Sequence, residues 1–284
     1  METLSVVCGL VIVYNLVKLA RRKCLSRKFG PKDTVLITGG AQGIGFEIAK
    51  AYSELGCKVV IWDIDSKQLS KAKLTLPNSL AFVCDITCTQ SIESAVKKTL
   101  ESTDCISLLV NNAAIANHKS AQQLTNCELE KLFQTNLFGH VKVTKELMPH
   151  IKYLAVVSSV LSFHSVAYEA DYCSSKSALS SYFSTLRQEL KIAKSSPRVT
   201  LVYPYHTSTR LFSKVDTGIW KYLFKTLNPK DVANALVKAV SEGQEEVFVP
   251  KYSKFVMFSL FFLPSWLKDW VIITVFGQRL KTSI

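Results

Sequence analysis

The sequence lacks the motifs that mark zinc proteins and serine hydrolases. Its eight cysteines include no C-x-x-C pair and none stands at ligand spacing from a histidine, which argues against any metal site. Several cysteines lie within apolar runs such as AFVC, a pattern typical of small buried side chains in a reducing compartment rather than of disulfides. No G-x-S-x-G sequence is present, so the nucleophile of an α/β-hydrolase is missing.

Acidic residues are outnumbered, at 22 against 35 lysines and arginines, which gives a formal net charge of +13. Such a charge suits nucleic acid, an anionic membrane surface or an anionic cofactor. No basic run is interleaved with aromatic residues along a helix, which argues against a nucleic-acid partner. The densest basic cluster follows an apolar N-terminus, where membrane headgroups are the expected partner; it comprises Lys18, Arg21, Arg22, Lys23, Arg27 and Lys28.

No apolar run reaches the roughly 20 residues that a membrane-spanning helix needs. The N-terminal run, residues 4–17, has no basic stretch before it and no A-x-A cleavage pattern after it, which argues against a removed signal peptide. We predict that residues 1–29 are a retained membrane anchor with a basic flank, either spanning or lying at the interface; a buried core helix is the alternative. The body would then face the cytosol, at the endoplasmic reticulum membrane or a lipid droplet.

From Pro31 onward, apolar runs alternate with amphipathic stretches. Seven runs are predicted to be strands, at 34–38, 58–62, 80–84, 106–110, 153–158, 199–203 and 246–250. Helical patterns fall between them, at 43–55, 66–73, 89–102, 125–149, 172–194 and 229–242, and Thr125 with Glu128 has the spacing of a capping box. Strands that are apolar on both faces are typical of a parallel sheet covered by helices on both sides. We therefore predict a doubly wound Rossmann-type α/β domain over residues 30–250.

The C-terminal residues 251–284 turn apolar again, and Pro264 interrupts them. Neither half is long enough to span a membrane comfortably. Two interfacial helices with Trp266 and Trp270 at headgroup depth are predicted. The alternative is an apolar surface that a second subunit covers, and we expect the protein to be a homodimer.

A glycine-rich stretch, TGGAQGIG at 38–45, directly follows the first predicted strand and opens the first predicted helix. At such a place glycines let the backbone approach a diphosphate, and the helix N-terminus offers free N–H groups to it. The spacing of Gly39, Gly43 and Gly45 is one residue longer than G-x-G-x-x-G, and a purely structural turn is the alternative.

An acidic residue, Asp63, ends the second predicted strand about 20 residues beyond the glycines, where a carboxylate bonds ribose hydroxyls and repels a 2′-phosphate. Gln42 stands in the glycine loop where a cation could otherwise meet that phosphate. Both features favour NAD over NADP. The alternative is that Asp63 merely caps the following helix.

The motifs TGGAQGIG, NNAA and YCSSK, with Asn136 and Ser159, occur in an order that resembles the short-chain dehydrogenase/reductase family. The resemblance covers residues 31–250. The apolar N-terminus, LNPKDVA at 227–233 and the proline-broken tail resemble the membrane-associated branch with retinol dehydrogenases and lipid-droplet 17β-hydroxysteroid dehydrogenases. The resemblance implies a catalytic set of Asn136, Ser159, Tyr172 and Lys176.

The pair of Tyr172 and Lys176 suits proton transfer during hydride chemistry. A free tyrosine, with a pKa of about 10, is a poor base at neutral pH and needs a cation nearby. Residues four apart share one face of a helix, so Lys176 can favour the phenolate of Tyr172. Ser159 would hydrogen-bond the substrate oxygen. By resemblance, Lys176 also reaches the cofactor ribose, and Asn136 holds a water that relays protons to Lys176.

The resemblance extends to further cofactor contacts. Asp85 is expected at the adenine and Thr209 at the nicotinamide amide, while Asn111 would support the fourth strand and the ribose side, or have a structural role only. The full predicted cofactor set is Gly39, Gly43, Ile44, Gly45, Asp63, Asp85, Asn112, Tyr172, Lys176 and Thr209. Two departures from the family pattern are Ala114, in place of glycine in NNAG, and Tyr205, in place of the glycine after Pro204, where a bulky side chain could reshape the pocket.

These features predict an NAD(P)-dependent alcohol dehydrogenase or ketone reductase that prefers NAD and acts on an apolar substrate, a steroid, retinoid or long-chain lipid. The segment from Pro204 to about Asn228, which covers the pocket by resemblance, is rich in apolar residues. The alternative is a catalytically weak member that binds the cofactor and serves as an interaction protein at a membrane or lipid droplet.

Overall fold

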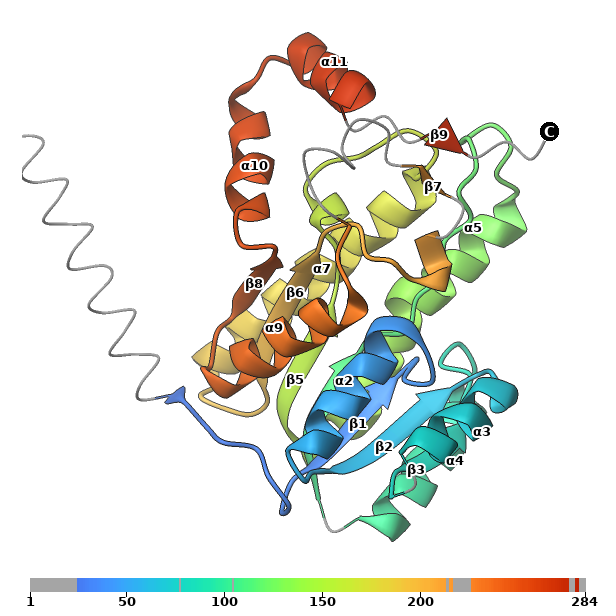
Figure 1. Ribbon diagram of the computed structural model, residues 1–284, viewed down its shortest axis with the longest axis vertical. Coiled ribbons are helices and arrows are strands. Elements are labelled where there is room, and N and C mark those ends of the chain that lie inside the picture. Colours follow the sequence, from blue (N-terminus) through green and yellow to red (C-terminus); the bar gives the residue numbers. More distant parts are fainter. Residues whose placement is uncertain are drawn as a thin grey trace, which may run out of the picture.

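The computed structural model describes residues 25–76, 78–103, 105–212, 215–216, 226–275 and 279–280. Its centre is a seven-stranded sheet with the strand order β3-β2-β1-β4-β5-β6-β8, and every neighbouring pair is parallel (Figure 1). The order reverses between β1 and β4. At such a switch point the carboxyl ends of the strands leave a crevice in which ligands bind.

All seven predicted strands are present, each within two residues of its expected bounds. They are β1 (Thr34–Thr38), β2 (Lys58–Asp63), β3 (Leu80–Val83), β4 (Ile106–Asn111), β5 (Ile151–Val157), β6 (Arg198–Pro204) and β8 (Glu246–Val249). The two central strands, β1 and β4, are buried along their whole length. Helices cover both of their faces, and this explains why these strands are apolar at consecutive rather than alternate positions.

Helices pack on both faces of the sheet. They are α2 (Gly43–Glu54), α3 (Ser66–Thr75), α4 (Thr89–Ser102), α5 (Asn126–Phe133), α6 (His140–Leu147), α7 (Ala170–Ile192) and α9 (Pro229–Ser241). The side chains of successive residues of β1 pack on opposite faces of the sheet. Val35 and Ile37 pack with residues of α2, α3 and α9, whereas Leu36 packs with residues of α4, α6 and α7. The doubly wound arrangement predicted from the sequence is therefore confirmed.

The helix predicted over 125–149 is not a single α-helix. Thr125 and Glu128 form the predicted capping box at its start. After α5 the backbone runs through a π-helical segment, η1 (Gln134–Gly139), before α6 and a 3₁₀ turn, η2 (Met148–His150). π-Segments inside helices often coincide with functional positions, and Asn136 lies within this one.

The C-terminal region forms the two predicted helices on either side of Pro264. α10 (Ser253–Ser259) continues into a 3₁₀ turn, η5 (Leu260–Phe262), and α11 (Ser265–Val275) follows; both helices lie beyond the end of β8 (Figure 1). Met257 and Leu260 are buried in the core shared with the sheet. A short antiparallel pair joins β7 (Val215–Asp216) to β9 (Arg279–Leu280).

The predicted anchor at residues 4–17 lies outside the described residues. Within the described part of the chain, no helix is long and apolar enough to cross a membrane. Residues just before β1 belong to the folded body: Phe29 is buried, and Arg27 forms a salt bridge with Asp33. The folded body therefore includes part of the segment assigned from sequence to the basic flank.

Candidate active site

A cavity of about 1310 Å³ opens at the carboxyl ends of the central strands. Residues at the ends of β1, β2, β4, β5 and β6 line it, together with the first turns of α2 and α7. Cavities for drug-sized ligands are roughly 300–1,000 Å³. The space at the switch point is therefore large enough for more than one such ligand.

Three glycines shape the loop between β1 and α2, each for a different reason. Gly39 and Gly43 have φ angles of 62° and 58°, a region that other residues rarely adopt. Gly45 has no room for a side chain, since a Cβ there would lie 2.3 Å from the carbonyl oxygen of Gly39. Gln42 precedes α2 without capping it through its side chain. This glycine loop and the helix N–H groups fit the diphosphate of a dinucleotide.

Asp63 ends β2 at the edge of the cavity and holds the glycine loop in place. Its Oδ2 accepts a hydrogen bond from the Ala41 N–H at 3.1 Å, and its Oδ1 accepts one from the Asp65 N–H at 3.1 Å. The helix α3 is capped by Asp65, which accepts from the backbone of Lys67 and Gln68. The alternative that Asp63 caps this helix is therefore wrong, and its carboxylate stands at the cavity instead.

The other predicted cofactor residues lie around the same cavity, Gly45 excepted, which lies behind the loop. Asn112 donates from its amide to the carbonyls of Thr38 and Gly39, at 3.1 and 3.0 Å, so it fastens β4 to the glycine loop. Asn111 is fully buried and donates to Thr144 Oγ1 at 2.8 Å, in support of the structural alternative. The wall is completed by Ile44, Asp85 and Thr209.

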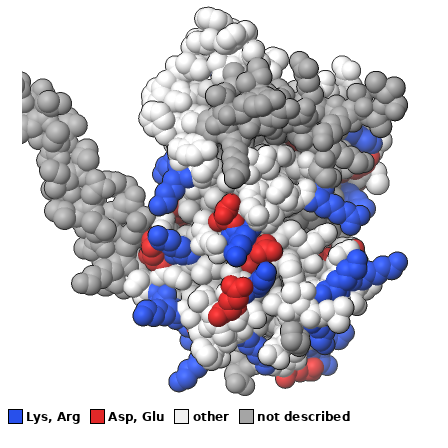
Figure 2. Space-filling view, viewed as in Figure 1, with Lys and Arg blue, Asp and Glu red and all other residues white. Residues whose placement is uncertain are grey.

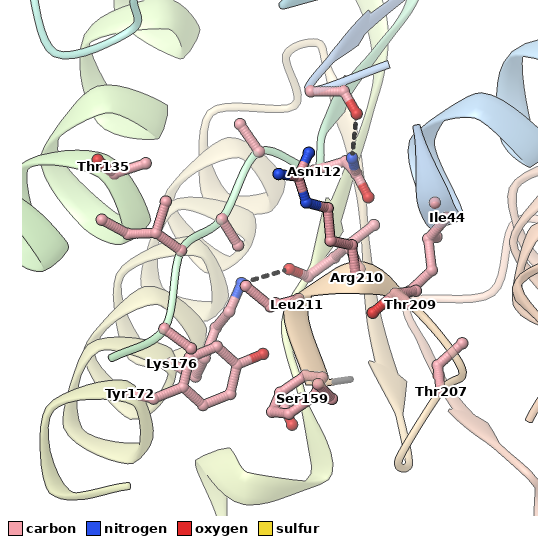
Figure 3. A pocket seen from close by; sticks show the side chains of 18 of the residues that line it. Ile44, Asn112, Thr135, Ser159, Tyr172, Lys176, Thr207, Thr209, Arg210 and Leu211 are labelled. Carbon is pink, nitrogen blue, oxygen red and sulfur yellow. Dashed lines mark hydrogen bonds between the residues drawn. The ribbon is translucent and has the colours of Figure 1, made fainter. Parts of the chain in front are cut away.

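Tyr172 and Lys176 project from the first turns of α7 into the cavity, and Ser159 lies nearby, two residues beyond the end of β5 (Figure 3). Tyr172 is only 4% exposed and Lys176 only 1%. The ammonium of Lys176 donates to the Val157 carbonyl at 3.0 Å and lies 5.7 Å from the centre of the Tyr172 ring. The structure thus brings together the three side chains that the sequence analysis assigned to proton transfer.

Burial dominates the electrostatics of this trio. Burial raises the pKa of Tyr172, the charge of Glu169 raises it further, and a hydrogen bond with Ser159 opposes the shift. Burial also lowers the pKa of Lys176 to about 7. The phenol is therefore protonated at neutral pH, contrary to the prediction that Lys176 favours the phenolate, and the ammonium charge is lost as the pH rises through about 7.

Asn136 occupies a supporting place rather than the cavity wall. Its amide oxygen accepts from the Ile115 N–H at 2.9 Å, and its amide nitrogen donates to the Ile115 carbonyl and to Ser175 Oγ. The amide of Asn136 therefore already has hydrogen-bond partners in the loop after β4 and in α7. The role of Asn136 in holding a relay water stays a prediction.

Several residues at the cavity carry no sequence motif. Tyr205, the departure from the family pattern, lines the cavity and packs against the core, so its ring lies within the wall of the pocket. His118 and Glu169 lie 51 positions apart in sequence, and their side chains meet beside Tyr172. No spacing rule could have paired them, because the contact depends on how the loop after β4 folds back over α7.

Comparisons with known proteins agree with this architecture. The family described as short chain dehydrogenase matches residues 33–220. The chain belongs to the short-chain dehydrogenase family. Bovine short-chain dehydrogenase/reductase 3 is 30% identical over 86% of this chain and 84% of that protein. Human estradiol 17-beta-dehydrogenase 11 is 29% identical over 89% and 85% of the two chains, and human epidermal retinol dehydrogenase 2 is 28% identical over 84% and 80%.

A solved structure shows the same fold. A short-chain dehydrogenase/reductase from Burkholderia phymatum, in complex with NAD, superimposes with a TM-score of 0.74 at 19% identity. The match covers 81% of this chain and 93% of the other. The relatives include estradiol and retinol dehydrogenases, and the resemblance to that branch stated from the motifs is confirmed.

Proposed function

We propose that the protein is an NAD(H)-dependent dehydrogenase or reductase that interconverts an apolar alcohol and its ketone or aldehyde. The arrangement of Tyr172, Lys176 and Ser159 on the floor of the cavity carries the proposal. Estradiol and retinol dehydrogenases among the relatives support a steroid, retinoid or long-chain lipid as the substrate. A bound nicotinamide would supply or accept the hydride.

The chain's own residues account for the proton and for substrate orientation. Tyr172 donates its phenolic proton to the substrate oxygen in reduction and takes it back in oxidation. Ser159 steadies that oxygen by a hydrogen bond. Lys176, held by the Val157 carbonyl, places a positive charge beside the phenol and stabilises the phenolate that proton donation leaves.

Part of the cavity wall is apolar and suits the substrate proposed here. It includes Val160, Leu161, Val166, Leu211 and Phe212. Such a wall favours a hydrocarbon skeleton over a sugar or small acid, because it offers those polar groups few hydrogen-bond partners. Turnover of purified protein with NAD(H) and NADP(H) against a panel of steroid, retinoid and long-chain alcohols and ketones tests the proposal. Absence of turnover on the whole panel, with the cofactor bound, would favour the alternative of a cofactor-binding interaction protein.

We expect NAD(H) to be preferred because Asp63 would repel a 2′-phosphate. The double substitution Asp63→Asn with Ile64→Arg removes that carboxylate and adds a cation at an exposed residue of the cavity wall. The ratio of kcat/KM for NAD(H) to that for NADP(H) should fall by roughly 10- to 100-fold.

The matched control for this substitution is Asp65→Asn, which removes the same charge two residues away, from a side chain that caps α3. In Asp65→Asn the ratio of kcat/KM for NAD(H) to that for NADP(H) should equal the ratio in the unmodified protein. Equal or better catalytic efficiency of the unmodified protein with NADP(H) would contradict the assignment of Asp63.

We propose further that the outer surface of α10, η5 and α11 docks on a membrane and admits substrate from the lipid phase. Large apolar side chains stand exposed there: Phe255, Phe258, Phe261, Phe262, Trp266, Trp270 and Ile273. Lys251, Lys254 and Lys268 lie on the same segment, against a single Asp269, which suits an anionic headgroup layer. In Figure 2 the α10 region forms a largely uncharged surface.

Binding to liposomes tests this surface. Removing the whole tail would also remove the buried Met257 and Leu260, so point substitutions are the cleaner choice. A chain without residues 1–24 should still bind anionic liposomes, and adding Phe262→Ser with Trp266→Ser should release most of it. Leu74→Ser, at a residue on α3 that is 84% exposed, is the matched control and should change nothing.

Two results would contradict the docking proposal. One is full release on removal of residues 1–24 alone. The other is a double variant that stays on liposomes but changes from dimer to monomer in light scattering. The second result would assign the apolar surface to the expected homodimer instead.

A further inference from the structure

A histidine–glutamate pair, with the glutamate fully buried and the histidine partly exposed, lies beside Tyr172, and the proposed proton transfer makes no use of it. His118 Nδ1 lies 2.5 Å from Glu169 Oε1, and His118 Nε2 lies 2.6 Å from the carbonyl oxygen of Leu211. Glu169 is 0% exposed. The imidazole thereby connects three segments: the loop after β4, the start of α7, and the 3₁₀ turn η4 (Arg210–Phe212).

The two contacts fix the number of hydrogens that the pair carries. The Leu211 carbonyl can only accept, so Nε2 of His118 must carry a hydrogen. The contact between Nδ1 and Oε1 needs one more hydrogen, on either atom. The pair therefore holds two hydrogens, as imidazolium with carboxylate or as neutral imidazole with carboxylic acid. Loss of one hydrogen sets a nitrogen lone pair against an oxygen in one contact, and that hydrogen bond is broken.

The surroundings hold this second hydrogen in place. Burial lowers the pKa of His118, but the hydrogen bond and charge of Glu169, the Leu211 carbonyl and the charge of Asp171 raise it more. Burial raises the pKa of Glu169. Burial and the charge of His118 lower the pKa of His206, from the loop after β6, and Tyr172 on α7 is a neutral phenol. The remaining charged group on η4 is the exposed Arg210.

The sign of the pH effect follows from these directions. Both shifts favour the two-hydrogen state, so the pair keeps its second hydrogen to a higher pH than a free histidine would. The two contacts are complete below that point. One of them is lost as the pH rises through the raised pKa of the pair.

The hydrogen bond between His118 and the Leu211 carbonyl fixes the part of the cavity wall that packs against Tyr172. The next residue, Phe212, packs its ring edge-on against Tyr172 at 5.4 Å and lies 5.4 Å from the ring of His118. The same turn follows Thr209, which lines the cavity near the glycine loop. His118 itself has a φ angle of 53°, a conformation uncommon for a residue other than glycine, and two hydrogen bonds on its side chain hold it there.

We propose that His118 and Glu169 form a proton-dependent latch that holds Leu211 and Phe212 against Tyr172 and so positions the substrate. Both are positioning residues that act through the turn η4, and the charge of Glu169 in addition raises the pKa of Tyr172. The latch itself follows from the contacts of the pair, whereas its effect on substrate affinity rests on the proposed function.

Hydrogen exchange across residues 207–212 of the full-length protein, corrected for the intrinsic effect of pH, tests the latch directly. The Phe212 amide, bonded to the Thr209 carbonyl at 3.2 Å, should lose roughly tenfold in protection between pH 6 and 9, the loss expected for one hydrogen bond. In Glu169→Gln the new amide donates to Nδ1 while Nε2 still donates to Leu211. Protection in this variant should be independent of pH.

Two further variants make the test specific. His118→Asn keeps a residue type that tolerates positive φ but is too short to bridge both partners, so protection should be low at every pH. His206→Gln replaces the other histidine that contacts Phe212 and should retain the pH response of the unmodified protein. An unchanged pH response in Glu169→Gln, or full protection in His118→Asn, would overturn the latch.

Steady-state kinetics separates the latch from the proposed function. For an apolar alcohol, KM of the unmodified protein should rise with pH more steeply than KM of Glu169→Gln; KM rather than kcat is the readout, because the charge of Glu169 also raises the pKa of Tyr172. If hydrogen exchange behaves as expected and no substrate is turned over, the latch stands and the proposed function fails. Matching KM profiles in the two proteins would overturn the positioning role.

Discussion

Tyr172→Phe is expected to reduce kcat by about 10²- to 10⁴-fold, the usual contribution of a general acid or base. The substitution deletes the phenolic oxygen and nothing else. The ring would keep its edge-on contact with Phe212 and its place over Lys176, so the fold and cofactor binding should be unchanged. Single-turnover rates with bound NADH, together with NADH affinity from fluorescence titration, measure the two effects separately.

The matched control is Tyr182→Phe, the same change at a half-exposed position of the same helix, which should have full activity. Lys176→Ala should resemble Tyr172→Phe in kcat, because the phenolate then lacks its cation. Near-normal turnover in either active-site variant would show that the proton moves by another route.

The fold was predictable because burial constrains the central strands of the sheet. Strands β1 and β4 are apolar at consecutive positions, and only a sheet covered on both faces hides such strands from water. The structure departs from the prediction where local backbone geometry differs from what the hydrophobic pattern indicates. The π-helical segment η1 keeps the same side-chain types as an α-helix, so periodicity predicts one long helix there.

The site residues were predictable only where a motif reflects a required backbone conformation or a fixed spacing between side chains. The positive φ of Gly39 and the four-residue step from Tyr172 to Lys176 are both legible in the sequence. The hydrogen-bond partners of Asn136 are not, because they depend on the loop after β4 bringing the Ile115 backbone against η1. The pair of His118 and Glu169 was missed for the same reason.

Gly45→Ala is expected to weaken NADH binding by roughly 10- to 100-fold, which corresponds to about 1–3 kcal/mol of overpacking. A Cβ at this position would lie 2.3 Å from the Gly39 carbonyl oxygen and 2.5 Å from the Asn112 amide nitrogen. The first of these atoms is backbone and the second is fixed by two hydrogen bonds, so neither can move aside alone. The whole glycine loop must shift relative to α2.

The proper comparison for Gly45→Ala is Gly30→Ala, because a Cβ at Gly30 would meet nothing within 4 Å. That control should bind NADH normally. Gly43→Ala separates the two reasons for glycine in this loop, since its φ of 58° is strained for alanine while the nearest atom to its Cβ would be 3.5 Å away. We expect a smaller loss there than at Gly45. If Gly45→Ala binds NADH as tightly as the unmodified protein, the diphosphate does not rest on this loop, and the cofactor assignments of Gly39, Gly43 and Ile44 fall with it.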